Sequence, residues 1–152
     1  MKDKSWIVIV GIIAVIFSLK LLPAAVSLNE TVLIANSSAD LVEIIHFHAT
    51  QQCYSCRTLG NLTEQTVNTY YSDELESGKI TFRHINIDLE ANAELVKQYQ
   101  VTGSALMIGT KIGDAFNIEE NVQAWYKIGN EIEFMTYLKG LIDKRLSGDL
   151  SQ

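Results

Sequence analysis

Apolar residues are most concentrated at the start of the chain. Residues 6–28 form a run interrupted by the charged Lys20, and this run follows Lys2 and Lys4. About 20 of these positions are usable by a single helix, which is enough to cross a hydrocarbon layer roughly 30 Å thick. Basic residues ahead of such a segment keep its N-terminus in the cytoplasm. We therefore predict a signal anchor over residues 1–28, spanning the membrane at residues 6–28, with the rest of the chain outside the cytoplasm.

A cleaved signal peptide is the alternative interpretation of this segment. Residues 25–27 read Ala-Val-Ser, and signal peptidases inspect small residues of this kind. Cleavage there would release a secreted protein, so both interpretations place the body outside the cytoplasm.

The next part of the chain alternates between strand and helix patterns. Residues 29–40 read as a linker and a first element, and residues 41–49 are a β-branched and aromatic run typical of a strand buried on both faces. Residues 57–71 have apolar positions at helical spacing. Residues 79–88 alternate with period two, which predicts a second strand, and residues 89–99 have acidic residues early, as a helix does.

The last third continues the alternation. We expect, in order, a strand at 105–108, a turn through Gly109 and Gly113, an acidic insertion at 114–121, a strand at 122–128 and a helix at 131–146. This order predicts an α/β domain over residues 41–147, with a central mixed sheet flanked by helices and a short tail at 148–152.

Composition and charge narrow the possible functions. The chain has 152 residues, 47% of them apolar and 20% charged, which is typical of a folded domain. Its net charge of −6 argues against nucleic-acid binding, because affinity for phosphate backbones comes mainly from Lys and Arg. No G-x-G-x-x-G nucleotide fingerprint is present, so we expect no cofactor. Two cysteines are too few for a four-cysteine zinc site.

Those two cysteines are the strongest chemical signal. Cys53 and Cys56 are separated by Tyr54 and Ser55, after the predicted strand and at the start of the predicted helix. This spacing brings the sulfurs within bonding distance, and a helix N-terminus stabilises a thiolate. We predict a reversible dithiol/disulfide couple in which Cys53 is the exposed attacking thiolate and Cys56 resolves the mixed disulfide. An inert disulfide and a metal site remain open at this point.

Several motifs occur in the order found in one family. They are the strand at 44–49, the segment Cys-Tyr-Ser-Cys-Arg at 53–57, Ile-Asn-Ile-Asp at 85–88, Tyr-Gln-Val-Thr-Gly at 99–103 and Tyr-Lys-Ile-Gly at 126–129. With these motifs the chain resembles the thioredoxin family over about residues 30–147. The resemblance implies a five-stranded thioredoxin-like sheet and thiol–disulfide exchange, and the N-terminal anchor looks like the extracytoplasmic, membrane-anchored branch.

The resemblance also assigns roles to residues around the cysteines. Ser104 and Ala105 correspond to the family's substrate-facing loop, and Ala105 stands where the family has a cis-proline. We expect a trans peptide bond before Ala105, because a cis bond before a non-proline residue costs about 2.5–4 kcal/mol. The position nearest the family's buried acid, beneath the second cysteine, is His46.

The histidines allow three interpretations. His46 and His48 share one face of their strand, being two residues apart. His46 is a candidate proton acceptor for Cys56, because an imidazole titrates near neutral pH. Alternatively, both bond to backbone or water, or they join Cys53 and Cys56 in a copper or zinc site. We expect His84 at the surface.

The function implied by these residues is thiol–disulfide exchange outside the cytoplasm, in the reducing direction and with protein disulfides as substrates. Electrons to reduce the cysteine pair again would come from a polytopic membrane thiol protein, because the chain has no nucleotide site of its own. The alternative is a metal-binding or partner-docking module that uses the same fold without turnover.

By its place at a strand end, Asp88 is expected to cap the following helix.

Overall fold

The computed structural model describes residues 38–151. The predicted anchor at 1–28 and most of the predicted linker at 29–40 lie outside this range. Within the range, no helix has both the length and the apolar character needed to cross a membrane.

A four-stranded mixed sheet forms the centre of the described part. The strands are β1 (Leu41–His48), β2 (Ile80–Asn86), β3 (Ala105–Ile112) and β4 (Ala115–Glu120), in the spatial order β2-β1-β3-β4. β1 runs parallel to β2 and antiparallel to β3, and β4 forms a hairpin with β3. β1 lies between β2 and β3, and its side chains are buried on both faces of the sheet, which explains its nearly continuous apolar sequence.

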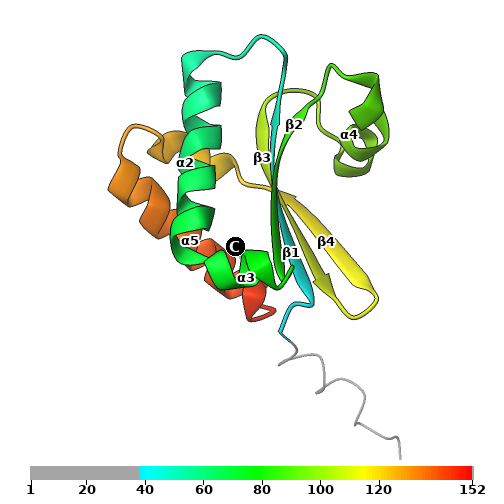
Figure 1. Cartoon of the computed structure of the whole chain (residues 1–152), viewed down its shortest axis with the longest axis vertical. Coiled ribbons are helices and arrows are strands. Elements are labelled where there is room, and N and C mark those ends of the chain that lie inside the picture. The colour runs from blue at the N-terminus through cyan, green and yellow to red at the C-terminus, as the bar shows by residue number, and fades with distance from the viewer. Residues whose placement is uncertain (1–37, 152) are drawn as a thin grey trace, which may run out of the picture. The chain divides into compact units, whose positions relative to one another are not determined.

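Helices cover both faces of this sheet, as Figure 1 shows. α2 (Tyr54–Tyr70), α3 (Ser72–Glu76) and α5 (Glu131–Leu146) lie on one face, and α4 (Ala93–Tyr99), preceded by the 3₁₀ turn η1 (Glu90–Asn92), lies on the other. The prediction of an α/β fold with a mixed sheet between helices is therefore confirmed for the described residues.

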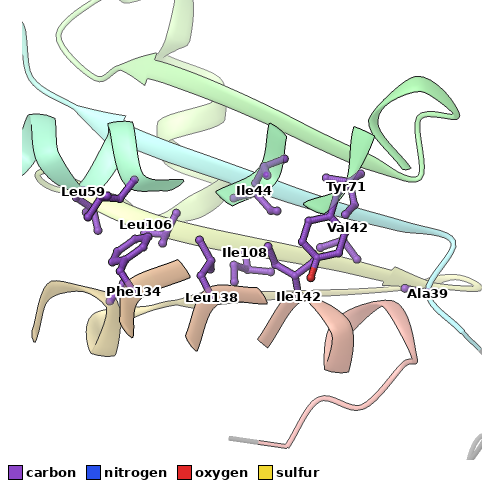
Figure 2. Close-up of a cluster of buried hydrophobic side chains, with 14 residues drawn as sticks. Ala39, Val42, Ile44, Leu59, Tyr71, Leu106, Ile108, Phe134, Leu138 and Ile142 are labelled. Atoms are coloured by element: carbon purple, nitrogen blue, oxygen red, sulfur yellow. The ribbon is translucent and has the colours of Figure 1, made fainter. Parts of the chain in front are cut away.

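Two hydrophobic clusters hold these layers together. On the α2 and α5 face, Phe134 and Leu138 of α5 pack against Leu106 and Ile108 of β3, as Figure 2 shows. On the α4 face, the cluster contains Ile45, Phe47, Tyr99, Ala105 and Met107. Successive residues of a strand point to opposite faces, so β1 contributes to both clusters.

Two predictions for the last third are wrong. Residues 122–128 do not form a strand: the segment is the 3₁₀ helix η2 (Val122–Lys127), and the side chain of Asn121 accepts a hydrogen bond of 3.2 Å from the backbone N–H of Ala124. The acidic insertion at 114–121 instead contains β4. Acidic residues are tolerated in β4 because it is an edge strand that is largely exposed.

The predicted turn is also shorter than expected. Gly113, with φ of +57°, makes the turn between β3 and β4, whereas Gly109 lies inside β3. A Cβ atom at Gly109 would come within 2.6 Å of the Tyr99 hydroxyl and of the Phe116 ring, so glycine is needed there for close packing. The resemblance implied five strands, and residues 38–151 contain four.

A buried ion pair connects β4 to α5. Arg145 is 0% exposed, and its guanidinium donates from two nitrogens to the carboxylate of Glu119. Its third nitrogen donates to the backbone carbonyls of Asp149 and Ser151, at 2.7 and 3.0 Å. The arginine thus binds part of the predicted tail at 148–152 to the end of α5.

Candidate functional site

The cysteine pair lies where β1 leads into α2. Cys53 is the N-cap residue of α2, and its sulfur accepts a hydrogen bond of 3.1 Å from the backbone N–H of Cys56. The two residues are joined in a disulfide with their Cα atoms 5.1 Å apart. Cys53 is exposed and Cys56 is half-buried. This is the strand–loop–helix setting predicted from the sequence, although α2 begins three residues earlier than the predicted helix at 57–71.

Polar side chains of the β2 end hold the loop that precedes Cys53. The backbone N–H of Thr50 donates to the Asp88 carboxylate at 2.7 Å, and the Asn86 amide donates to the Thr50 hydroxyl at 3.0 Å. The bond from Thr50 also lowers the pKa of Asp88, because it stabilises the ionised carboxylate. The expectation that Asp88 caps the next helix is therefore wrong: the N-cap residue of η1 is Leu89, and it makes no side-chain cap bond.

Three histidines gather on the α2 face of the sheet, beneath the cysteine loop. In the β1–β2 register, His46 lies opposite His84, and their Nδ1 atoms are 2.9 Å apart. The His48 ring stacks on the His46 ring with centroids 5.5 Å apart. On the outer side, Nε2 of His84 is 3.4 Å from a carboxylate oxygen of Glu64 on α2. We call His46, His48 and His84 the histidine cluster.

His46 is the buried member of the cluster. His46 is 1% exposed, and its Nε2 atom has no hydrogen-bond partner among the described residues. The pKa of His46 is lowered to about 4, chiefly by burial and then by the neighbouring His84 and His48, while a hydrogen bond with the Cys56 backbone raises it. The ring is therefore neutral at physiological pH while the cysteines are oxidised.

The other two histidines, His48 and His84, make different contacts. His48 lies 3.0 Å from the carbonyl of Ala49 through its Nδ1 atom, which is the backbone bond that one interpretation expected. His84 is at the surface, as predicted, but it also connects His46 with Glu64. No local pattern predicts this connection, because it depends on the register between β1 and β2, and the two histidines are 38 residues apart in the chain.

Tight packing against α2 positions the His46 ring. Gly60, one turn after Cys56, faces the ring, and a Cβ atom there would lie 2.6 Å from Cε1 of His46 and 3.1 Å from Cε1 of His84. A glycine at this position therefore allows α2 to approach the histidine cluster closely.

Ser104 and Ala105 lie at the same end of the sheet as the cysteine loop. Ala105 opens β3 opposite Phe47, and all peptide bonds in the described range are trans, as expected for the bond before Ala105. The Ala105 side chain is buried in the cluster on the α4 face, and Ser104 is half-buried. Both residues line a cavity of about 420 Å³ next to the end of α4. Contact of this loop with a substrate stays a prediction.

The predicted metal alternative requires His46, His48, Cys53 and Cys56 to converge as ligands. Both sulfurs are occupied by the disulfide. Within residues 38–151, no group of three or more His, Cys, Asp or Glu side chains has an arrangement that would hold a metal ion.

Comparisons with known proteins identify similar structures but no matching sequence. No protein-family model matches the chain, and no curated protein matches it. The Trx4 domain of ERdj5 is similar with a TM-score of 0.50 and 10% identity, over 74% of this chain and 86% of that domain. The chain also matches a thioredoxin from Thermus thermophilus, with a TM-score of 0.43 and 14% identity over 69% of this chain and 76% of that one. It matches the germline-specific thioredoxin Deadhead from Drosophila melanogaster with a TM-score of 0.42 and 17% identity, over 69% of this chain and 81% of that one.

The sheet order, the helices on both faces and the similarity to the Trx4 domain agree with one another. At such low identity the similarity concerns the fold alone. Residues 38–151 therefore adopt a thioredoxin-like α/β fold, with a disulfide-forming Cys-x-x-Cys pair at the N-terminus of α2.

Proposed function

We propose that the chain is a thiol–disulfide oxidoreductase whose redox couple is Cys53 and Cys56. The observation that carries this proposal is the position of Cys53: it is exposed, caps α2, and accepts a hydrogen bond from the Cys56 backbone. Such a bond and the helix N-terminus both stabilise a thiolate at Cys53 once the pair is reduced. The half-buried Cys56 is within disulfide distance of Cys53, and its burial keeps its sulfur from attacking the disulfide of a large substrate directly.

The reaction proceeds in two exchanges. The Cys53 thiolate attacks one sulfur of a substrate disulfide, forms a mixed disulfide and releases the first substrate thiolate. Cys56 then loses its proton and attacks the sulfur of Cys53, which releases the second substrate thiolate. The substrate gains two electrons, and the protein is left with the Cys53–Cys56 disulfide.

A rapid-mixing experiment tests this proposal. The reduced full chain is mixed with an excess of a chromogenic aromatic disulfide, and release of the coloured thiolate is followed. We expect two phases: the first has a rate that rises with the reagent concentration, and the second has a rate that does not, because it is intramolecular. A docking module without turnover chemistry would show slow, single-phase labelling at the rate of an ordinary exposed thiol, and this result would contradict the proposal.

The site of action forms a second part of the proposal. The apolar run at residues 6–28 after two lysines supports a tether that holds the domain outside the cytoplasm, where protein disulfides are available as substrates. A domain that works there in the reducing direction needs a supply of electrons through the membrane, and a polytopic membrane thiol protein fits this need. A short tether raises the effective concentration of the cysteines near such a donor.

Fractionation of cells tests the tether. We expect the full-length chain in the membrane fraction after washing at alkaline pH, because an apolar span is retained in the bilayer whereas peripheral proteins are released. The measurement is N-terminal sequencing and immunodetection of the washed membranes. A mature chain that begins at residue 28 and appears in the soluble fraction would instead show a cleaved signal peptide and a secreted protein.

A further inference from the structure

β4 has an outer edge with an unpaired backbone. It is the last strand of the sheet, and its neighbour on the inner side is β3. The backbone N–H of Asn121 donates to the carbonyl of Leu106 at 2.8 Å, so Asn121 faces β3. Facing alternates along an antiparallel pair, so the backbones of Phe116, Ile118 and Glu120 face away from β3. Their N–H and C=O groups have no hydrogen-bond partner among the described residues, so this edge can accept another strand.

A cleft opens beside this edge, on the face of the sheet that α5 covers. Its volume is about 640 Å³, which is within the range of ligand-binding clefts. One wall is the end of β4 and the start of η2, and the other wall is α5. Gly140 of α5 leaves room in its wall, because nothing lies within 4 Å of a Cβ atom added there. The apolar groups that line the cleft are Val122, which is 48% exposed, Leu141 and the ring of Tyr137.

The unpaired edge and the cleft together fit an extended polypeptide. A strand added to β4 uses the unpaired N–H and C=O groups for main-chain hydrogen bonds, and its alternate side chains point to opposite faces of the sheet. Side chains on the α5 face enter the cleft, whose lining favours apolar ones. Side chains on the α4 face lie beside those of Phe116, Ile118 and Glu120, because Ile118 packs into the α4-face cluster and Phe116 contacts the Tyr99 ring.

Charge along this edge selects the partner. Asp114 and Glu120 are exposed, and neither forms an ion pair within residues 38–151. In an antiparallel pairing of two β4 strands centred on Asn117, Asp114 of one copy would come close to Glu120 of the other, and like charges at such positions destabilise a strand pair. A strand with basic residues on the α4 face is favoured instead. Lys144 lines the cleft on the α5 face, so it does not face those basic residues.

We propose that the outer edge of β4 and the adjoining cleft form a docking site for an extended segment of a partner protein in which basic and apolar residues alternate. A basic residue of the partner lies beside Glu120 on the α4 face, and an apolar residue occupies the cleft between η2 and α5. Docking makes no use of the cysteines, so this inference goes beyond the proposed oxidoreductase function and stands or falls without it.

Fluorescence anisotropy of a labelled peptide tests this docking site. The probe is an end-blocked peptide of alternating lysine and valine, added to the oxidised full chain in detergent, so that no thiol exchange takes place. We expect saturable binding at low salt. The matched peptide of alternating glutamate and valine should bind more weakly, because its glutamates lie beside Glu120. A lysine–valine peptide with methylated backbone nitrogens should not bind, because it cannot donate to β4. Equal binding of the three peptides would overturn the proposal.

Variants of the two walls test which residues bind the peptide. Gly140→Leu fills the cleft, and we expect it to lower the affinity for the lysine–valine peptide about tenfold, because the valine side chain is no longer buried. Glu120→Lys reverses the charge, so it should shift the preference toward the glutamate–valine peptide. Glu76→Lys on α3, an exposed position away from β4, is the matched control and should leave both affinities unchanged. An unchanged preference in Glu120→Lys would contradict the proposal, provided that circular dichroism shows the variant to be folded.

Amide hydrogen exchange locates the bound peptide. The amides of Phe116, Ile118 and Glu120 should exchange more slowly in the complex, whereas those of Asn117 and Glu119, which face β3, should change little. Protection of the first three amides without peptide, together with a dimer in sedimentation, would show that a second copy occupies the edge and would overturn the proposal. Protection confined to the residues around the cysteines would overturn it as well.

Discussion

Cys53→Ser abolishes thiol–disulfide exchange, whereas Cys56→Ser leaves the first attack intact and stops the reaction at the mixed disulfide. The difference follows from position: Cys53 is exposed at the N-cap of α2, and Cys56 is half-buried behind it. Only Cys53 receives both the helix N-terminus and the Cys56 N–H, which together stabilise a thiolate. The measurement is mass spectrometry of each variant after incubation with a model disulfide, together with the rate of thiolate release.

Ser55→Ala is the matched control for this pair, because it changes a side chain between the two cysteines without removing a sulfur. We expect it to keep both phases of the reaction. The assigned roles would be reversed if Cys53→Ser accumulated the mixed disulfide and Cys56→Ser did not react.

Gly60→Ala is expected to destabilise the protein, and Gly140→Ala is expected to stabilise it. Both glycines lie inside helices, where alanine is favoured over glycine by about 1 kcal/mol. At Gly60 the new methyl group would lie 2.6 Å from Cε1 of His46 and still closer to its Nδ1, and overpacking of this kind typically costs about 1–3 kcal/mol. At Gly140 nothing lies within 4 Å of the added Cβ atom, so the helix preference acts alone.

Urea denaturation of the two variants, compared with the unmodified chain, measures this difference. The midpoints should move in opposite directions. Equal stabilisation by both substitutions would mean that the His46 ring can move aside, and the close approach of α2 to the histidine cluster would then have no structural importance.

Local patterns were sufficient to predict much of this fold. β1 is predicted by its continuous apolar run, and α5 has the helical spacing that its sequence shows. The cysteine pair was correctly expected between a buried strand and a helix. These features depend on residues that are close together in the chain. Hydrophobic periodicity and helix-start signals are patterns of such neighbouring residues, so they predict these features. The anchor at residues 6–28 lies outside the described residues and stays a prediction.

Features that depend on position in the fold were not predicted. β4 and η2 were exchanged in the prediction, because an edge strand accepts acidic residues that a local pattern assigns to a loop. The bonds between Asp88 and Thr50, and between Arg145 and Glu119, join segments that are 38 and 26 residues apart.

The histidine cluster shows the same division at the candidate site. The spacing in the sequence was sufficient to predict that His46 and His48 share a strand face, because side chains two residues apart in a strand point the same way. The tertiary structure was needed to show that His84 lies opposite His46, that Gly60 lets α2 approach the rings, and that Glu64 lies 3.4 Å from His84. Strand register and helix docking are set by the packing of the whole core, so no local pattern carries them.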